Sequence, residues 1–391
     1  MTRFGRFAYA AHRMKIIDRY LLRQFIKTFL ICFLSLLGLF VVFHAFTNLE
    51  AFLKIAHKQG GLGRLMGVYY AQQSILFFDR TVGLVNLTAA MFTLTWIQRH
   101  NELIALMAAG VSRVRVVMPV VGAVAVVIGL AALNRELVIP QFRNELSRKP
   151  HDLAADVPRT FSPQYDERTD ILIRGQAAVA AQQKINRPSL RLPASLDHYT
   201  KQITAKEAYY KPPADSRPGG YLLVGIDHPK DLSSQPSLVL DGSPVIITSR
   251  DARDWLEPGQ CFLVSGIGFE QLTNADAWRE FSSTAQLIRA LENRSLDLGG
   301  TTRVTIHGRI VQPLLDLTLL FLGLPLIVTR ESRNVFIAMG LCAAVSLAFM
   351  VVLVTFQYLG GMYAMNPALA VWLPLVIFVP VAAEMSVSMA K

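Results

Sequence analysis

The residues best placed to carry a function lie in the polar segment 98–115, between two apolar runs, which reads QRHNELIALMAAGVSRVR. Asn101 can cap a short helix, and Glu102 lies in its first turn, where a carboxylate complements the helix dipole. Arg99 lies two residues before Asn101. The pattern therefore predicts a short helix, over 99–112, that joins two membrane spans.

The apolar residues of the same segment have helical spacing. Leu103, Leu106 and Met107 form one apolar stripe, and Gly110 can end the helix in a left-handed conformation. Such a helix is suited to fit into the groove of a partner protein. It can equally rest in the lipid headgroup layer, and the residues alone leave both interpretations open.

A second group of candidate residues consists of His44, Lys54 and Lys58, at and beyond the end of the first apolar run. A lipid with phosphorylated sugars needs cations near the mouth of its cavity, where charges are screened less than in bulk water. The alternative is a histidine bonded to a neighbouring side chain and two lysines that face lipid headgroups.

Asp316 presents a similar choice, because it lies inside an apolar run and intramembrane acids are often functional. The residue follows Pro313 by about one turn, close enough to the membrane interface for water to reach it. We therefore favour a hydrated acid without a special role.

No catalytic site is expected. The sequence has no paired Cys or His at metal-ligand spacing, no H-E-x-x-H, no G-x-S-x-G and no G-x-x-x-x-G-K-[ST] phosphate loop. Basic residues are not interleaved with aromatic ones on one face, which argues against nucleic acid as a partner. We expect neither a metal nor a cofactor, and ATP hydrolysis only on a separate protein.

The elements that position these residues are membrane spans. Of 391 residues, 52% are hydrophobic and only 17% charged, and the mean hydropathy is +0.36. The apolar runs predict six transmembrane helices, at 29–46, 81–97, 116–133, 311–328, 335–357 and 368–383. The last two come from a run, 335–383, that has no charged residue and far exceeds the about 20 residues of one crossing. Gly360, Gly361, Asn366 and Pro367 supply its turn.

The net charge of +11 is unevenly distributed, which predicts the orientation. Basic residues are concentrated in 1–28 and in the segments on the same side of the membrane: Arg99, Arg113, Arg115, Arg330, Arg333 and Lys391. The short segments on the other side hold only Lys54, Lys58 and Arg64. Because basic loops stay in the cytoplasm, we expect a multi-pass inner-membrane protein with both termini cytoplasmic. Met14 is a second candidate start, which would leave 1–13 as a dispensable extension.

The segment 134–309 lies between the third and fourth spans and is therefore expected outside. It has β-like runs at 170–174, 203–211, 221–227, 237–240, 245–248 and 262–265, separated by turn residues, as in a sandwich, jelly roll or barrel. Residues 178–197 lack such a pattern and are interpreted as a mobile insertion. A helix is predicted at 281–293, capped by Ser282 or Ser283, with Leu287, Ile288 and Leu291 on one apolar face.

Several segments together resemble one family. The motif R-x-N-E-L-x-A-L-x-A-A-G-V-S, from Arg99, is similar to the cytoplasmic coupling helix of the LptF/LptG lipopolysaccharide-export permeases. IDRYLLRQFIKTF (17–29), NRELVIPQ (134–141), ITAKEAYY (203–210), TTRVTIHGRIVQPL (301–314) and LGLPLIV (322–328) resemble further parts of that family in the same order. The resemblance extends from about Met14 to Lys391, and only 178–197 has no counterpart.

The resemblance implies an α-helical membrane protein with six transmembrane helices (3+3) and an inserted all-β, jellyroll-like periplasmic domain. It divides the chain into 1–28, 29–133, 134–309 and 310–391. It implies a permease subunit that works with a cytoplasmic ATP-binding-cassette dimer, a second permease of the family or a second copy, and a periplasmic jellyroll bridge protein. The cargo would be lipopolysaccharide or a similar glycolipid. By the same analogy Arg99, Glu102, Leu103, Leu106, Met107 and Gly110 couple to the ATPase, with Glu102 transmitting its movement.

Two other functions remain open at this stage. One is an FtsX/MacB-like subunit that transmits movement but carries no lipid, although such proteins usually have their soluble domain after the first span. The other is a membrane scaffold that binds envelope proteins. The shared motifs do not distinguish an F-like from a G-like half, and they leave the lipid and the β-domain topology undetermined.

Overall fold

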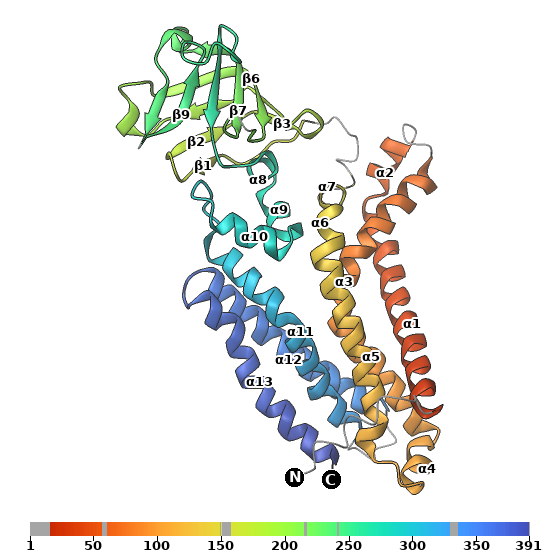
Figure 1. Ribbon diagram of the computed structural model, residues 1–391. Helices are drawn as coiled ribbons and strands as arrows, with labels where there is room; N and C mark the ends of the chain where they lie inside the picture. The colour runs from red at the N-terminus through yellow and green to blue at the C-terminus, as the bar shows by residue number, and fades with distance from the viewer. Residues whose placement is uncertain are drawn as a thin grey trace. The chain divides into compact units, whose positions relative to one another are not determined.

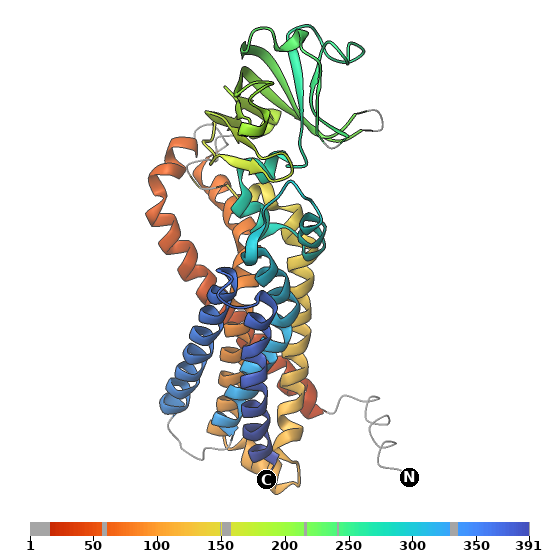
Figure 2. The same cartoon turned by 90° about the vertical axis from the view of Figure 1, so that its left-hand side faces the viewer.

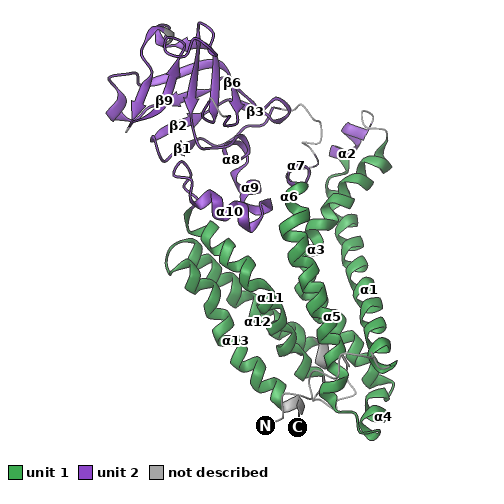
Figure 3. Ribbon diagram, viewed as in Figure 1, with its two compact units in different colours: residues 1–50, 59–142, 299–391 green, residues 51–58, 143–298 purple. Residues whose placement is uncertain are grey.

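The computed structural model describes residues 16–56, 61–148, 150, 158–214, 217–240, 242–328 and 335–390. The chain forms two compact units, which are coloured separately in Figure 3. Unit 1 comprises residues 1–50, 59–142 and 299–391, and unit 2 comprises 51–58 and 143–298. The division after 142 and before 299 differs from the expected boundaries at 134 and 309.

Unit 1 is a bundle of long helices: α1 (Ile16–Thr47), α3 (Leu62–Arg99), α5 (Arg113–Leu133), α11 (Gly299–Val328), α12 (Val335–Gly361) and α13 (Pro367–Ala390), as Figure 1 shows. In the part of the chain that the structure describes, six helices are long and apolar enough to cross a membrane. Three precede the β-rich insertion and three follow it. The predicted fold class, a helical membrane protein with an inserted β-domain, is confirmed.

The helices extend beyond the apolar runs. α1 begins at Ile16, inside the segment expected as a separate N-terminal stretch, and α11 begins at Gly299, inside the expected insertion. Hydropathy marks only the part of a helix that suits lipid, whereas backbone hydrogen bonding continues until a residue breaks it. No Gly or Pro interrupts 16–29. The predicted turn between the last two spans is confirmed, since α12 ends at Gly361 and α13 begins at Pro367.

The connections of unit 1 place three segments at one end of the bundle. The start of α1, the short helix α4 (Glu102–Ala108) and the end of α13 all lie there (Figures 1 and 2). This arrangement follows from an even number of crossings.

α11 packs against α3, α5, α12 and α13, and glycines allow close approach between helices. A Cβ on Gly360 would lie 2.5 Å from the Cβ of Ala370, and one on Gly323 would overlap Leu87. The core of unit 1 includes Val85, Val120, Val311, Leu319 and Leu324. By contrast, only 6% of the most apolar stretch of α1 is buried. Leu34, Leu39, Phe43 and other large side chains of this helix are therefore exposed.

A π-helix over Asn134–Val138 follows α5 and is held to α3 by two side chains. The Nε of Arg135 donates to both carboxylate oxygens of Asp79, at 2.9 and 3.1 Å. Asn134 Nδ2 donates to the carbonyl oxygen of Ile75 at 3.1 Å. π-Helical turns are rare. Asp79 of α3 therefore pairs with a residue of the segment that follows α5.

Unit 2 contains an antiparallel sheet of β1 (Gln164–Asp166), β2 (Ile171–Arg174), β3 (Ala177–Val179), β4 (Lys184–Asn186), β5 (Ser189–Arg191), β6 (Gln202–Lys211), β7 (Gly220–His228), β8 (Leu238–Leu240), β9 (Ser243–Thr248) and β10 (Gln260–Val264). The strand order is β1-β2-β5-β6-β7-β10-β9-β8, and β4 pairs with both β3 and β6. All six β-like runs predicted from the sequence are strands.

The interpretation of 178–197 as a mobile insertion is wrong. Its three short strands pair within the sheet, and Ala178, Ile185 and Leu190 are buried in its core. Each strand is only three residues long, too short to show an alternating pattern. Its partners come from elsewhere in the chain: Ile185 lies opposite Ala208 of β6. Tertiary pairing, rather than local periodicity, orders this segment.

One face of the sheet packs on the main core of unit 2, which includes Ile171, Ile173, Ile203, Leu223 and Leu263. The other face has a smaller apolar cluster of Leu256, Phe262 and Val264, against which Leu222 and Ile247 pack.

The segment between the sheet and α11 contains α8 (Phe269–Thr273), α9 (Ala275–Phe281) and α10 (Thr284–Leu291). Ser283 caps α10: its Oγ accepts from the backbone N–H of Gln286 at 3.2 Å, and the Gln286 side chain accepts from the N–H of Ser283 at 3.1 Å. Leu287 is buried, whereas Ile288 and Leu291 are exposed, so the described residues cover only one of the three residues on the predicted apolar face.

Gly220 provides a test of the sheet packing. It lies opposite Val264, and a Cβ there would overlap the carbonyl oxygen of Leu263, a backbone atom that cannot move without shifting β10. We expect Gly220→Ala to lower the free energy of unfolding by about 1–3 kcal/mol. Urea unfolding followed by tryptophan fluorescence measures this. Gly67→Ala, in open space on α3, is the control and should not lower the free energy of unfolding. An equal decrease in both variants would contradict the close contact between Gly220 and Leu263.

Glu207 provides a pH-dependent test. Its carboxylate accepts hydrogen bonds from Tyr209 Oη at 2.6 Å and Lys184 Nζ at 3.0 Å, and these lower the pKa of Glu207. A lowered folded-state pKa contributes stability above the unfolded-state pKa, about 4.3, that is lost as the pH falls through the folded-state pKa. Because the side chain is 38% exposed, we expect Glu207→Gln to cost only a few tenths of a kcal/mol at pH 7.

As the pH falls through the lowered folded-state pKa of Glu207, the stability difference between wild type and Glu207→Gln should shrink toward zero. Urea unfolding at pH 7 and pH 3.5 gives the comparison, with Glu292→Gln, at an exposed position on the same unit, as the control. A difference that stays constant with pH would show that the two hydrogen bonds contribute nothing.

Candidate functional site

The candidate site is α4, the short helix between α3 and α5. Asn101 precedes it in the left-handed region, with φ 58° and ψ 12°, a conformation that Asn tolerates better than most residues. Its side chain makes no capping hydrogen bond, so the predicted side-chain cap is wrong. The predicted end is confirmed: Gly110 has φ 80° and follows the last turn.

Two backbone hydrogen bonds close this end of α4. The N–H of Val111 donates to the carbonyl of Leu106 at 3.0 Å, and that of Gly110 to the carbonyl of Met107 at 2.9 Å. This is the Schellman arrangement, which requires a residue of positive φ at the position of Gly110. The helix therefore has a defined end, after which Ser112 starts α5 by accepting from the N–H of Arg115 at 3.4 Å.

Glu102 contacts α1. The hydroxyl of Tyr20 donates to its two carboxylate oxygens, at 3.0 and 3.2 Å. Sequence reasoning did not find Tyr20, because nothing in the order of residues relates positions 20 and 102. The carboxylate is half-buried and keeps the capacity to accept from a cation as well.

The predicted apolar stripe of α4 is divided between two faces. Leu103 and Leu106, together with Val111, pack on a cluster of Leu21, Ile97 and Val116 from α1, α3 and α5. Met107 points away from this cluster and is 39% exposed, and Ile104, which the sequence analysis did not single out, is 65% exposed.

α4 thus has an inner face that joins three long helices and an outer apolar face without cover in the described residues. A force applied to the outer face would pass to α1, α3 and α5 through Leu103 and Leu106. Basic residues surround it: Arg99 is exposed at the end of α3, and Arg115 pairs with Asp18 of α1 at 2.6 Å. The arrangement is suited to dock a protein groove and to transmit movement.

Of the three residues predicted to meet a lipid, the structure describes His44, in unit 1, and Lys54, in unit 2. His44 belongs to an aromatic cluster with Phe40, Tyr69 and Tyr70, and its Nδ1 lies 2.9 Å from the Tyr70 hydroxyl. This geometry matches the alternative interpretation of a histidine bonded to a neighbour. Lys54 is exposed on α2 (Leu49–Ala56), and Lys58 lies outside the described residues.

Asp316 is more enclosed than expected. Only 8% of the residue is exposed, and Gln312 Nε2 donates to its Oδ1 at 2.8 Å. A Cβ on Gly83 of α3 would lie 2.7 Å from the same oxygen, so α3 covers the carboxyl group. The interpretation of Asp316 as a hydrated interfacial acid is therefore wrong, because it considered only the position along α11 and not the helix packed against it.

The described residues contain no group of three or more His, Cys, Asp or Glu arranged to hold a metal ion.

Comparison with known proteins gives one family. A family model described as "Lipopolysaccharide export system permease LptF/LptG" matches residues 19–189 and 245–387, which is most of the chain. The curated proteins gave no match to the sequence.

Proposed function

Because the chain belongs to the LptF/LptG family of lipopolysaccharide export permeases, we propose that it is one permease subunit of an exporter driven by a separate ATPase. Membership makes it a multi-pass inner-membrane transport protein and not an enzyme. The subunit extracts lipopolysaccharide, or a related envelope glycolipid, from the inner membrane and passes it to a periplasmic bridge of jellyroll type.

The outer face of α4 is the observation that carries this proposal. Ile104 and Met107 present apolar side chains at the end of the bundle where both α1 begins and α13 ends. The sequence has no phosphate loop for ATP, so energy has to enter through a partner. We assign this end to the cytoplasm and its partner to a dimeric ATP-binding subunit.

α1 is the element that α4 can move. Glu102 accepts a hydrogen bond from Tyr20, and Leu103 and Leu106 pack around Leu21. α4 therefore contacts the first turns of α1 at two points. The rest of α1 exposes a long apolar surface. A second permease of the same family, or a second copy, placed along that surface would enclose a lipid-sized cavity that narrows when α4 is pushed.

The β-domain is suited to hand the lipid onward. Its sheet ends in two edge strands, β1 and β8, whose outer backbone groups can pair with a strand of another protein. Leu222 and Ile247, which are only partly buried beside the smaller apolar cluster, provide apolar surface for acyl chains.

Photo-crosslinking tests the proposal. A photoreactive residue at Leu34, exposed on α1, should capture lipopolysaccharide without ATP, and one at Leu222, in the β-domain, only with the ATPase partner and ATP. Val376, an equally exposed residue on α13, is the control for bulk lipid. If capture at Leu34 is no higher than at Val376 although the permease still moves in response to ATP, the result would instead favour a subunit that transmits movement without carrying lipid.

A further inference from the structure

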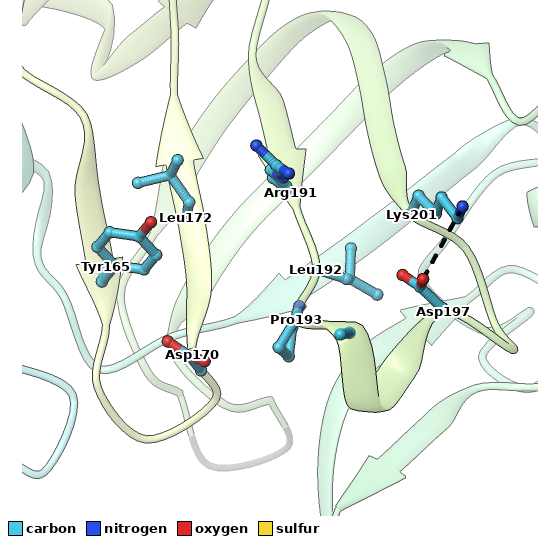
Figure 4. A pocket seen from close by; sticks show the side chains of 9 residues that line it. Tyr165, Asp170, Leu172, Arg191, Leu192, Pro193, Asp197 and Lys201 are labelled. Atoms are coloured by element: carbon cyan, nitrogen blue, oxygen red, sulfur yellow. Dashed lines mark ion pairs between the residues drawn. The ribbon is translucent and has the colours of Figure 1, made fainter.

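The β-domain has an open pocket of about 530 Å³ that none of the preceding functions uses (Figure 4). Its floor is a row of side chains across three neighbouring strands. Tyr165 of β1 lies opposite Leu172 of β2, which lies opposite Arg191 of β5. Residues directly opposite in a sheet point to the same face. Ile171, Ile173 and Leu190, which alternate with them, point into the core.

The row therefore lies on the face of the sheet turned away from that core. Leu172 is nevertheless only 9% exposed. Tyr165 by contrast is 54% exposed, so its ring is available as a flat surface beside the pocket.

Most polar groups around the pocket make few interactions with the rest of the described chain. Within the described residues, the Arg191 guanidinium, the Tyr165 hydroxyl and the Asp170 carboxylate have neither a hydrogen bond nor an ion pair. Asp170 is held at the end of its turn with φ 53°, and its backbone N–H donates to the carbonyl of Asp166 at 2.7 Å. Lys201 pairs with Asp197 only loosely, at 3.9 Å, and is 81% exposed (Figure 4).

We propose that this pocket binds a saccharide that carries an acidic group. The apolar face of a sugar ring can pack on the exposed ring of Tyr165, as other flat apolar groups do on aromatic side chains. The carboxylates of Asp170 and Asp197 accept from its hydroxyls. The fork of donors on Arg191 matches a carboxylate or phosphate.

Other ligands fit less well. An acyl chain requires a predominantly apolar lining, whereas this pocket is lined by four charged side chains: Asp170, Arg191, Asp197 and Lys201. A nucleic acid needs several cations to neutralise its phosphates, and here the two cations of the lining, Arg191 and Lys201, are offset by two carboxylates. The volume is sufficient for one or two sugar rings.

The pocket does not depend on the proposed export activity. Arg191, Asp197 and Lys201 lie between 189 and 245, a segment that the family model does not match. The site is also made entirely within unit 2. Failure of saccharide binding would thus leave the role of α4 untouched, and failure of ATPase docking would leave the pocket intact.

The test is ligand-observed NMR on the full chain in lipid nanodiscs, with D-galacturonate as the probe. Galactose provides the ring without the acid, and acetate the acid without the ring. We expect saturable binding of galacturonate, weakened about tenfold or more by Arg191→Gln and several-fold by Tyr165→Ala. Arg253→Gln, the same change at an exposed arginine outside the pocket, should leave binding unchanged.

Three results would overturn the proposal: no saturable binding, equal binding of galactose, or equal losses from Arg191→Gln and Arg253→Gln. Circular dichroism and thermal unfolding of each variant confirm that it is folded. Adding lipopolysaccharide to the nanodisc separates two sources of the saccharide. Competition would assign the pocket to the sugars of a membrane glycolipid, and its absence to a free acidic saccharide of the envelope.

Discussion

Replacing both Ile104 and Met107 by aspartate is expected to release the proposed ATP-binding partner from the permease. These two side chains form the exposed apolar face of α4, at 65% and 39% exposure. In a docked complex they would be buried. The loss of one such central side chain typically reduces the binding free energy by about 2 kcal/mol or more. Two carboxylates buried without partners add a further penalty. Binding should therefore weaken at least about 100-fold.

Co-purification of the ATPase with the tagged permease, followed by titration in detergent, measures this loss. The fold should survive, because neither side chain packs on the cluster of Leu21, Ile97 and Val116. Leu106→Asp is the informative contrast, since it places a charge against that cluster and should lower stability as well as binding. Val239→Asp, at an exposed position in β8, is the matched control. Unchanged co-purification with the double variant would exclude α4 as the docking element.

Replacing Asp79 by leucine is expected to cost about 3 kcal/mol of bundle stability. The Asp79 and Arg135 side chains are only 12% and 19% exposed, and the pair joins α3 to the π-helix after α5. Without Asp79, the guanidinium of Arg135 stays in a largely enclosed position and loses its ion-pair partner. An uncompensated charge in such a position is costly, because water no longer solvates it.

A double-mutant cycle separates the pair from its components. Asp79→Leu and Arg135→Leu should each destabilise the protein, while the variant with both changes should recover much of the loss, because two apolar side chains replace the pair. Reversible unfolding in mixed SDS micelles gives the free energies. Losses that simply add would mean that the two residues act independently.

The family fold and much of the candidate site were accessible from the sequence. Apolar runs longer than a membrane is thick report crossings whatever the tertiary packing, and a run without charge, such as 335–383, requires a turn. Glu102, Leu103, Leu106, Met107 and Gly110 were recognised as one helix with a defined end, because helical spacing and a terminal glycine are local signals.

Tertiary structure determined whether each of these side chains faces the helix bundle or lies exposed. Leu103 and Leu106 face inward while Met107 and Ile104 face outward, since the direction is set by Leu21, Ile97 and Val116 on three other helices. Contacts with residues distant in sequence also decide the burial of Asp316 against Gly83, the hydrogen bond of His44 with Tyr70 and the pairing of the short strands in 178–197. Local sequence encodes hydrophobicity and helix ends, because these depend on neighbours along the chain. Burial, pairing and exposure depend on residues far away in sequence, and only the folded chain brings those together.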